Sequence, residues 1–128
     1  MAEVSCALVV LAKSPLPGRV KTRMSPPLTD AECAHVHEAM MRDVFGLGRG
    51  FEHRLAFRAG DAHPVWDDAA RGGWCVREQR GADLGARIQQ AVDEALSLAD
   101  RVVVLGSDSP HLRDVDLRAA CVCLDHAD

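Results

Sequence analysis

"SCALVVLAKSPLPGRVKTRM", residues 5–24, joins an apolar run to a loop that contains Lys13, Arg19, Lys21 and Arg23. The apolar run is almost uninterrupted, which is typical of a strand that is covered on both faces of a parallel sheet. The chain as a whole carries a formal charge of −4, so the cations are a local feature of this basic loop (residues 13–23). Such a cluster predicts an anionic ligand. The alternative is a loop whose charges only face the solvent.

The rest of the chain repeats the alternation of apolar runs with helical patterns. Strands are predicted at residues 5–12, 54–59, 74–79 and 101–106, and helices at residues 30–47, 62–71, within 81–100, and 115–124. This order predicts an α/β layer structure with a mostly parallel sheet. Right-handed connections then place the carboxyl ends of all strands at one edge of the sheet, where such folds bind ligands.

Three of the predicted helices have recognisable starts. Thr29 and Glu32 have the spacing of a capping box, and Asp61 and Asp83 are suited to cap the next two helices. In the third helix an apolar stripe is predicted to face the sheet. It consists of Leu84, Ile88, Ala91, Val92, Ala95 and Leu96.

Length and composition indicate one globular domain over residues 1–128, with 48% hydrophobic and 27% charged residues. The acidic balance and the low aromatic content, three Phe, two Trp and no Tyr, argue against a nucleic-acid partner. No apolar run is long enough to span a membrane, and the first residues lack the cations of a secretory signal. Five cysteines without framework spacing are interpreted as reduced thiols, so a cytoplasmic location is expected.

Two loops are predicted to meet at the binding edge. In the basic loop, Gly18 can take a positive φ angle, and the arginine and lysine side chains can bind phosphate oxygens. The spacing is neither that of a Walker loop nor Gly-x-Gly-x-x-Gly. After the fourth strand comes GSDSP, residues 106–110, where Asp108 is a candidate ligand of Mg²⁺ or Mn²⁺ and Ser107 a candidate hydroxyl contact. The alternative is that Asp108 only caps the following turn.

Three segments, LAKSPLPGRVKTRM, GADLGARI and VVVLGSDSPHL, resemble the GT-A-fold, nucleotide-diphospho-sugar transferase superfamily. Within it the chain resembles the bacterial glycosyltransferase-like family, also described as radical-SAM or selenodomain-associated transferases, with members labelled arsenosugar-biosynthesis glycosyltransferases. The resemblance implies a Rossmann-like three-layer sandwich. It also implies that the basic loop holds nucleotide phosphates, through Lys13, Gly18, Arg19, Lys21 and Arg23. Gln79, Asp83 and Gly85 match a segment near the nucleotide, and Asp108 matches the metal-binding acid.

One feature of the resembling family is missing. Its members continue with a strand that ends in an Asp-Gly-Gly-Tyr-type motif, and this sequence contains neither Asp-Gly-Gly nor any Tyr. We therefore expect a single, incomplete nucleotide-binding domain that lacks the C-terminal part. Its open sheet edge would favour a homo-oligomer.

Three functions follow as expectations. The first is a metal-dependent glycosyltransferase-like protein that uses a nucleotide-activated sugar and an unidentified small-molecule acceptor. The second is a guanylyltransferase-like nucleotidyltransferase that uses a nucleoside triphosphate and releases pyrophosphate. The third is a non-catalytic nucleotide-binding remnant or subunit.

Overall fold

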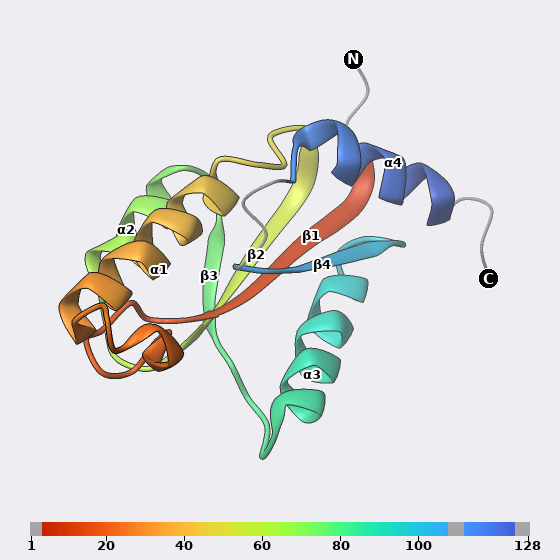
Figure 1. Cartoon of the computed structure of the whole chain (residues 1–128). Coiled ribbons are helices and arrows are strands. Elements are labelled where there is room, and N and C mark those ends of the chain that lie inside the picture. The colour runs from red at the N-terminus through yellow and green to blue at the C-terminus, as the bar shows by residue number, and fades with distance from the viewer. Residues whose placement is uncertain (1–3, 108–111, 125–128) are drawn as a thin grey trace.

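The computed structural model describes residues 4–107 and 112–124. Four strands form one parallel sheet: β1 (Val4–Lys13), β2 (Phe51–Ala59), β3 (Cys75–Glu78) and β4 (Val102–Gly106). Their order is β3-β2-β1-β4, and Figure 1 shows β1 between β2 and β4. The predicted α/β class and parallel sheet are confirmed.

The α-helices of the described residues cover the two faces of this sheet (Figure 1). They are α1 (Asp30–Phe45), α2 (Pro64–Arg71), α3 (Leu84–Leu96) and α4 (Asp114–Leu124). A short 3₁₀ helix, η1 (Thr22–Met24), begins within the end of the basic loop. One core cluster joins α1, α2 and α4 to the sheet, and a second joins α3 to the opposite face. The molecule therefore has three layers. No helix in the described ranges combines the length and the apolar character that a membrane span requires.

The central strand explains the uninterrupted apolar run. Leu8 and Val10 belong to the core beneath α1, α2 and α4, whereas Ala7 and Val9 belong to the core beneath α3. All four side chains are fully buried. Because successive residues of a strand face opposite sides, a strand between two helical layers needs apolar residues at every position.

Two of the three predicted caps are confirmed. The Oγ1 atom of Thr29 accepts from the Glu32 amide at 3.1 Å, and Oε1 of Glu32 accepts from the Thr29 amide at 2.9 Å. Asp83 Oδ1 accepts from the Ala86 amide at 2.8 Å. The prediction for Asp61 is wrong, because the capping residue of α2 is His63, whose Nδ1 accepts from Val65 at 3.0 Å. Proline is favoured at the first position of a helix, so Pro64 places the cap at His63, immediately before it.

The predicted apolar stripe of α3 is only partly buried. Ala91 and Ala95 are at most 1% exposed, whereas Leu84, Ile88 and Leu96 are 66%, 37% and 49% exposed. Among the described helices, α3 is alone on its face of the sheet, so no neighbouring helix covers the flanks of its stripe. The small alanines face the sheet and allow the close approach of α3.

Candidate functional site

The order of the strands places a crevice at the carboxyl ends of β1 and β4. From β1 the chain proceeds to β2 and β3 on one side, and β4 then pairs with β1 on the other side. Open α/β sheets bind ligands where the strand order reverses in this way. A cleft of about 910 Å³ lies at this point, and its walls come from the end of β1, the basic loop, α1, the β3–α3 connection and the residue after β4.

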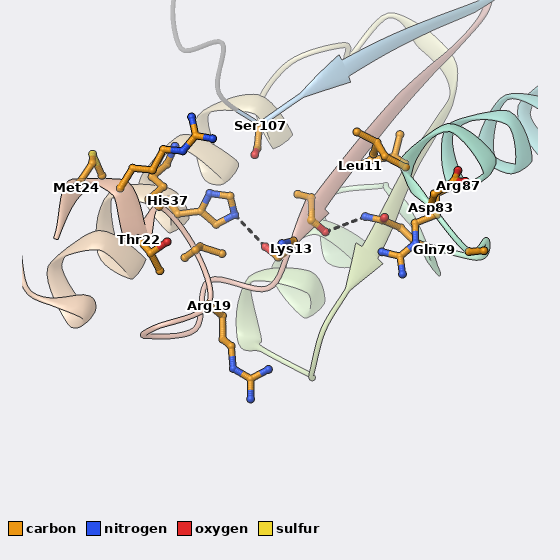
Figure 2. Close-up of a pocket in the computed structure, with 16 residues that line it drawn as sticks. Leu11, Lys13, Arg19, Thr22, Met24, His37, Gln79, Asp83, Arg87 and Ser107 are labelled. Atoms are coloured by element: carbon orange, nitrogen blue, oxygen red, sulfur yellow. Dashed lines mark hydrogen bonds between the residues drawn. The ribbon is translucent and has the colours of Figure 1, made fainter.

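The cleft brings together most of the site residues that the sequence predicts. Its lining includes Lys13, Arg19, Lys21, Arg23, Gln79, Asp83 and Ser107 (Figure 2). Gly18 and Gly85 lie in the same two segments but do not line it. Asp108 lies outside the described residues, directly after Ser107. Segments far apart in the sequence therefore meet, as predicted from the polarity of the sheet.

The backbone of the basic loop has two residues with positive φ. Gly18 has a φ of 76°, as expected, and Lys21 has a φ of 52° at the start of η1. A residue with a side chain is uncommon in this left-handed region, which costs on the order of 1–3 kcal/mol and is often found at functional sites. The loop thus keeps a lysine where glycine would fit with less strain.

The charges that line the cleft are mostly positive. Arg87, from α3, adds a cation opposite the basic loop. Among the described residues, five lysine and arginine side chains line the cleft with one carboxylate, that of Asp83. Within the described residues, no carboxylate forms a salt bridge with Lys13, Arg19 or Arg23. Asp83 is the N-cap of α3, and its Oδ1 is already bonded to the Ala86 amide. The cleft is therefore suited to an anionic ligand.

The β3–α3 connection is packed closely against α3. Gly81 has a φ of 140°, and a Cβ atom there would lie 2.8 Å from the backbone nitrogen of Arg87. The Gly81 carbonyl accepts from Nε of Arg87 at 3.2 Å, and this bond helps to orient the Arg87 side chain. Residues 81–87, GADLGAR, therefore form a closely packed turn that places Asp83 and Arg87 in the lining of the cleft.

Gln79 holds the two central strands together at the cleft. Its Nε2 donates to the Ala12 carbonyl at 3.3 Å and to the Phe57 carbonyl at 3.1 Å. Both donor hydrogens of the amide are thereby used, so only the side-chain oxygen is available to accept from a ligand. The predicted contact between Gln79 and a nucleotide is limited to this oxygen.

Two polar residues that anchor the basic loop were not predicted from the sequence. His37 on α1 is 6% exposed, and its Nε2 lies 2.9 Å from the Lys13 carbonyl oxygen (Figure 2). Its spacing from the buried Cys33 and Met41 places it on the inner face of α1, and this spacing was the available signal. Ser14 is 1% exposed, accepts from Trp66 Nε1 at 2.9 Å and donates to the Asp61 carbonyl. No sequence pattern indicated the role of Ser14.

The described residues show no ready-made metal cage, because no group of three or more His, Cys, Asp or Glu side chains converges among them. Mg²⁺ is usually bound by one or two carboxylates, with phosphate and water oxygens completing its shell. The hydroxyl of Ser107, which is 8% exposed, marks where the chain enters the cleft after β4. A metal site that is formed by one carboxylate after Ser107 in the sequence, together with the phosphates of a bound ligand, is compatible with this arrangement.

Comparison with known proteins agrees with the fold. The chain is 31% identical over 125 residues to a 2-phospho-L-lactate guanylyltransferase from Methanothermobacter thermautotrophicus, an alignment that covers 96% of this chain and 52% of the relative. The crystal structure of a "putative nucleotide-diphospho-sugar transferase" from Desulfovibrio desulfuricans G20 matches with a TM-score of 0.83 and 29% identity. That match covers 98% of this chain and 56% of the other.

The chain thus spans about half the length of the curated relative that it matches. Both similar proteins are named as transferases with nucleotide-containing substrates, which agrees with a cationic cleft at the switch point of the sheet. A family profile covers residues 43–128, which include the β3–α3 wall of the cleft and β4. By this match the chain belongs to the family described as "Uncharacterized protein conserved in bacteria (DUF2064)".

Proposed function

We propose that this chain is the nucleotide-binding part of a transferase whose donor is a nucleotide-activated sugar. The observation that carries the proposal is the position of the basic loop, which lines the switch-point cleft together with Gln79, Asp83 and Ser107. The structural match to a protein described as a nucleotide-diphospho-sugar transferase supports it. So does the sequence resemblance to the bacterial glycosyltransferase-like family.

In this proposal the diphosphate of the donor lies against the basic loop. Arg19 and Arg23 offer planar guanidinium groups that can bind phosphate oxygens in pairs, and Lys13 and Lys21 act as point charges. The nucleoside extends toward the opposite wall, where the Gln79 oxygen and the Asp83 carboxylate accept hydrogen bonds. Glycosyl transfer needs no covalent nucleophile from the protein here, so the chain contributes positioning and electrostatic stabilisation of the leaving diphosphate.

Mg²⁺ or Mn²⁺ fits this scheme as a cofactor. Asp108 would hold the ion together with phosphate oxygens of the donor, and the Ser107 hydroxyl lies next to it in the sequence. When bound, the ion supplies charge neutralisation for the departing diphosphate. The protein's own cations remain necessary, because they fix the position of the phosphates before any bond breaks.

A second candidate is nucleotidyl transfer, in which a substrate phosphate attacks the α-phosphate of a nucleoside triphosphate and pyrophosphate leaves. Two observations favour it: the curated relative is a guanylyltransferase, and five cations line the cleft in the described part of the chain. A triphosphate carries more negative charge than a diphosphate sugar, so it would offset more of this positive potential.

Product analysis distinguishes the two reactions. The protein is incubated with Mn²⁺ and either UDP-, GDP-, CDP- or dTDP-sugars or the four nucleoside triphosphates, with panels of small alcohols and phosphorylated hydroxy acids as acceptors. Release of a nucleoside diphosphate supports glycosyl transfer, and release of pyrophosphate supports nucleotidyl transfer. Tight, metal-dependent nucleotide binding without either product would instead indicate the non-catalytic binding function.

A further inference from the structure

Two successive carbonyl groups at the end of β1 are held by side chains from other elements. Gln79 donates to the Ala12 carbonyl, and His37 lies 2.9 Å from the Lys13 carbonyl oxygen. Figure 2 shows both contacts as dashed lines inside the cleft. They lie where the strand ends and the basic loop begins.

The pairing of the strands explains why a side chain is needed at Lys13. On one side, β1 pairs with β4 only as far as Leu11, which is opposite Gly106. On the other side, pairing with β2 continues to Lys13, opposite Ala59. The Lys13 carbonyl therefore lies beyond the end of β4, and His37 takes the place of a strand partner.

The peptide unit between Lys13 and Ser14 is consequently held at both ends. Its N–H, that of Ser14, donates to the Ala59 carbonyl at 2.8 Å, and its carbonyl accepts from His37. In a trans peptide these two groups point in opposite directions, so bonds to both fix the plane of the unit. This plane sets the direction in which the chain leaves the sheet.

His37 is well suited to this task. A carbonyl oxygen only accepts hydrogen bonds, so Nε2 of His37 must carry the hydrogen. The imidazole is buried on the inner face of α1 between Cys33 and Met41, which are both fully buried, so its position is fixed by packing. The donor is therefore in place before any ligand arrives.

We infer that His37 is a positioning residue for the phosphate-binding loop, acting through the Lys13 carbonyl. This inference rests on the proposed function, in which the basic loop binds phosphates. Without the donor, the Lys13–Ser14 peptide is held at one end only, and the loop has more orientations available. A ligand must then order the loop on binding, which lowers its affinity.

Three substitutions separate this role from a purely structural one. His37→Leu keeps a buried side chain of roughly similar size but removes the donor, whereas His37→Gln keeps an N–H group that can reach the carbonyl. His35→Leu is the matched control, because His35 is exposed and only two positions away on the same helix. Thermal unfolding verifies that each variant folds, and His37→Met replaces His37→Leu if the latter does not.

The first readout needs no ligand. Amide hydrogen exchange of residues 14–24 in the free protein should be about tenfold faster in His37→Leu, from the loss of one hydrogen bond at the base of the loop. His37→Gln should restore slow exchange, and amides of residues 8–10 should be unaffected. Unchanged exchange of the loop in His37→Leu would overturn the inference.

The second readout is calorimetric titration with inorganic pyrophosphate and Mg²⁺, a probe that has no base or sugar. We expect affinity to fall about tenfold in His37→Leu and to recover to within about threefold in His37→Gln, as for one hydrogen bond lost and replaced. Equal affinity of His37→Leu and wild type would contradict the positioning role. Failure of the wild type itself to bind would contradict the proposed function, whereas hydrogen exchange would still test the role of His37 in holding the loop.

Discussion

Replacement of Ser14 by alanine should destabilise the whole domain, although it removes a single oxygen atom. The Ser14 hydroxyl is buried between two partners: it accepts from Trp66 Nε1 at 2.9 Å and donates to the Asp61 carbonyl. Trp66 is itself only 3% exposed, so its indole N–H has no ready access to water once the hydroxyl is removed. The substitution thus leaves a buried donor without a partner.

The expected magnitude follows from these two contacts. Loss of the bond to Asp61 costs about 1 kcal/mol, and a buried indole N–H left unpaired costs about 1–2 kcal/mol more. We therefore expect Ser14→Ala to lower the free energy of unfolding by about 2–3 kcal/mol. Ser97→Ala is the control, because the Ser97 hydroxyl also donates to a carbonyl, that of Glu94 at 2.6 Å. Ser97 is exposed, so the loss of this hydrogen bond should cost less than about 0.5 kcal/mol.

Urea unfolding of the wild type and both variants measures these differences. A shift of the midpoint at constant slope reports a change in stability alone. The double variant Ser14→Ala/Trp66→Phe removes both the donor and the acceptor, so its loss should be smaller than the sum of the two single losses. A loss of stability for Ser14→Ala no larger than that for Ser97→Ala, or strict additivity in the double variant, would show that the buried contact between Ser14 and Trp66 does not stabilise the domain.

Three further predictions concern the backbone and the charges. Gly81→Ala should lower the free energy of unfolding by about 2 kcal/mol or more, since φ is 140° there and a Cβ atom would lie 2.8 Å from the backbone nitrogen of Arg87. In the same unfolding assay, the control Gly72→Ala, at a φ of −81°, should cost less than about 1 kcal/mol. Lys21→Gly should be more stable than Lys21→Ala by about 1 kcal/mol, because φ is 52° at this position. Equal stability of the two variants would show that the backbone is not strained at Lys21. Both variants should bind pyrophosphate more weakly than the wild type. The pKa of Asp68 is lowered, chiefly by its hydrogen bond to Arg42 and then by Arg71, so its contribution to stability is present above its usual pKa and is lost as the pH falls through the lowered value. The stability difference between wild type and Asp68→Asn should therefore shrink below about pH 4, and a difference independent of pH would contradict this prediction.

Local patterns were sufficient to predict most of the fold. The apolar run of β1 indicated burial on both faces, and the caps at Thr29 and Asp83 were readable because each involves residues within one turn. The meeting of the basic loop with Ser107 was predicted from the polarity of parallel strands. The order β3-β2-β1-β4 was not predicted, because it depends on contacts between distant segments.

The residues that hold the basic loop in place were beyond local patterns. Ser14 acquires its role from Trp66, 52 positions away, and Gln79 from Ala12, 67 positions away. The spacing of His37 from Cys33 and Met41 indicates the inner face of α1, but no sequence pattern indicates its contact with the end of β1. Likewise, the exposure of Leu84 reflects how few helices cover that face of the sheet in the described residues, which a helical period does not reveal.

The basic loop is proposed to bind the phosphates of a nucleotide in the switch-point cleft. Calorimetric titration of the wild type, Arg23→Ala and Arg71→Ala with UDP, GDP, CDP and dTDP, with and without Mn²⁺, measures this binding. Arg23 lines the cleft, whereas Arg71 lies at the end of α2 and does not. We expect metal-dependent binding of at least one nucleotide, weakened about tenfold or more by Arg23→Ala and unchanged by Arg71→Ala. Absence of binding by the folded wild type, or equal effects of the two substitutions, would contradict it.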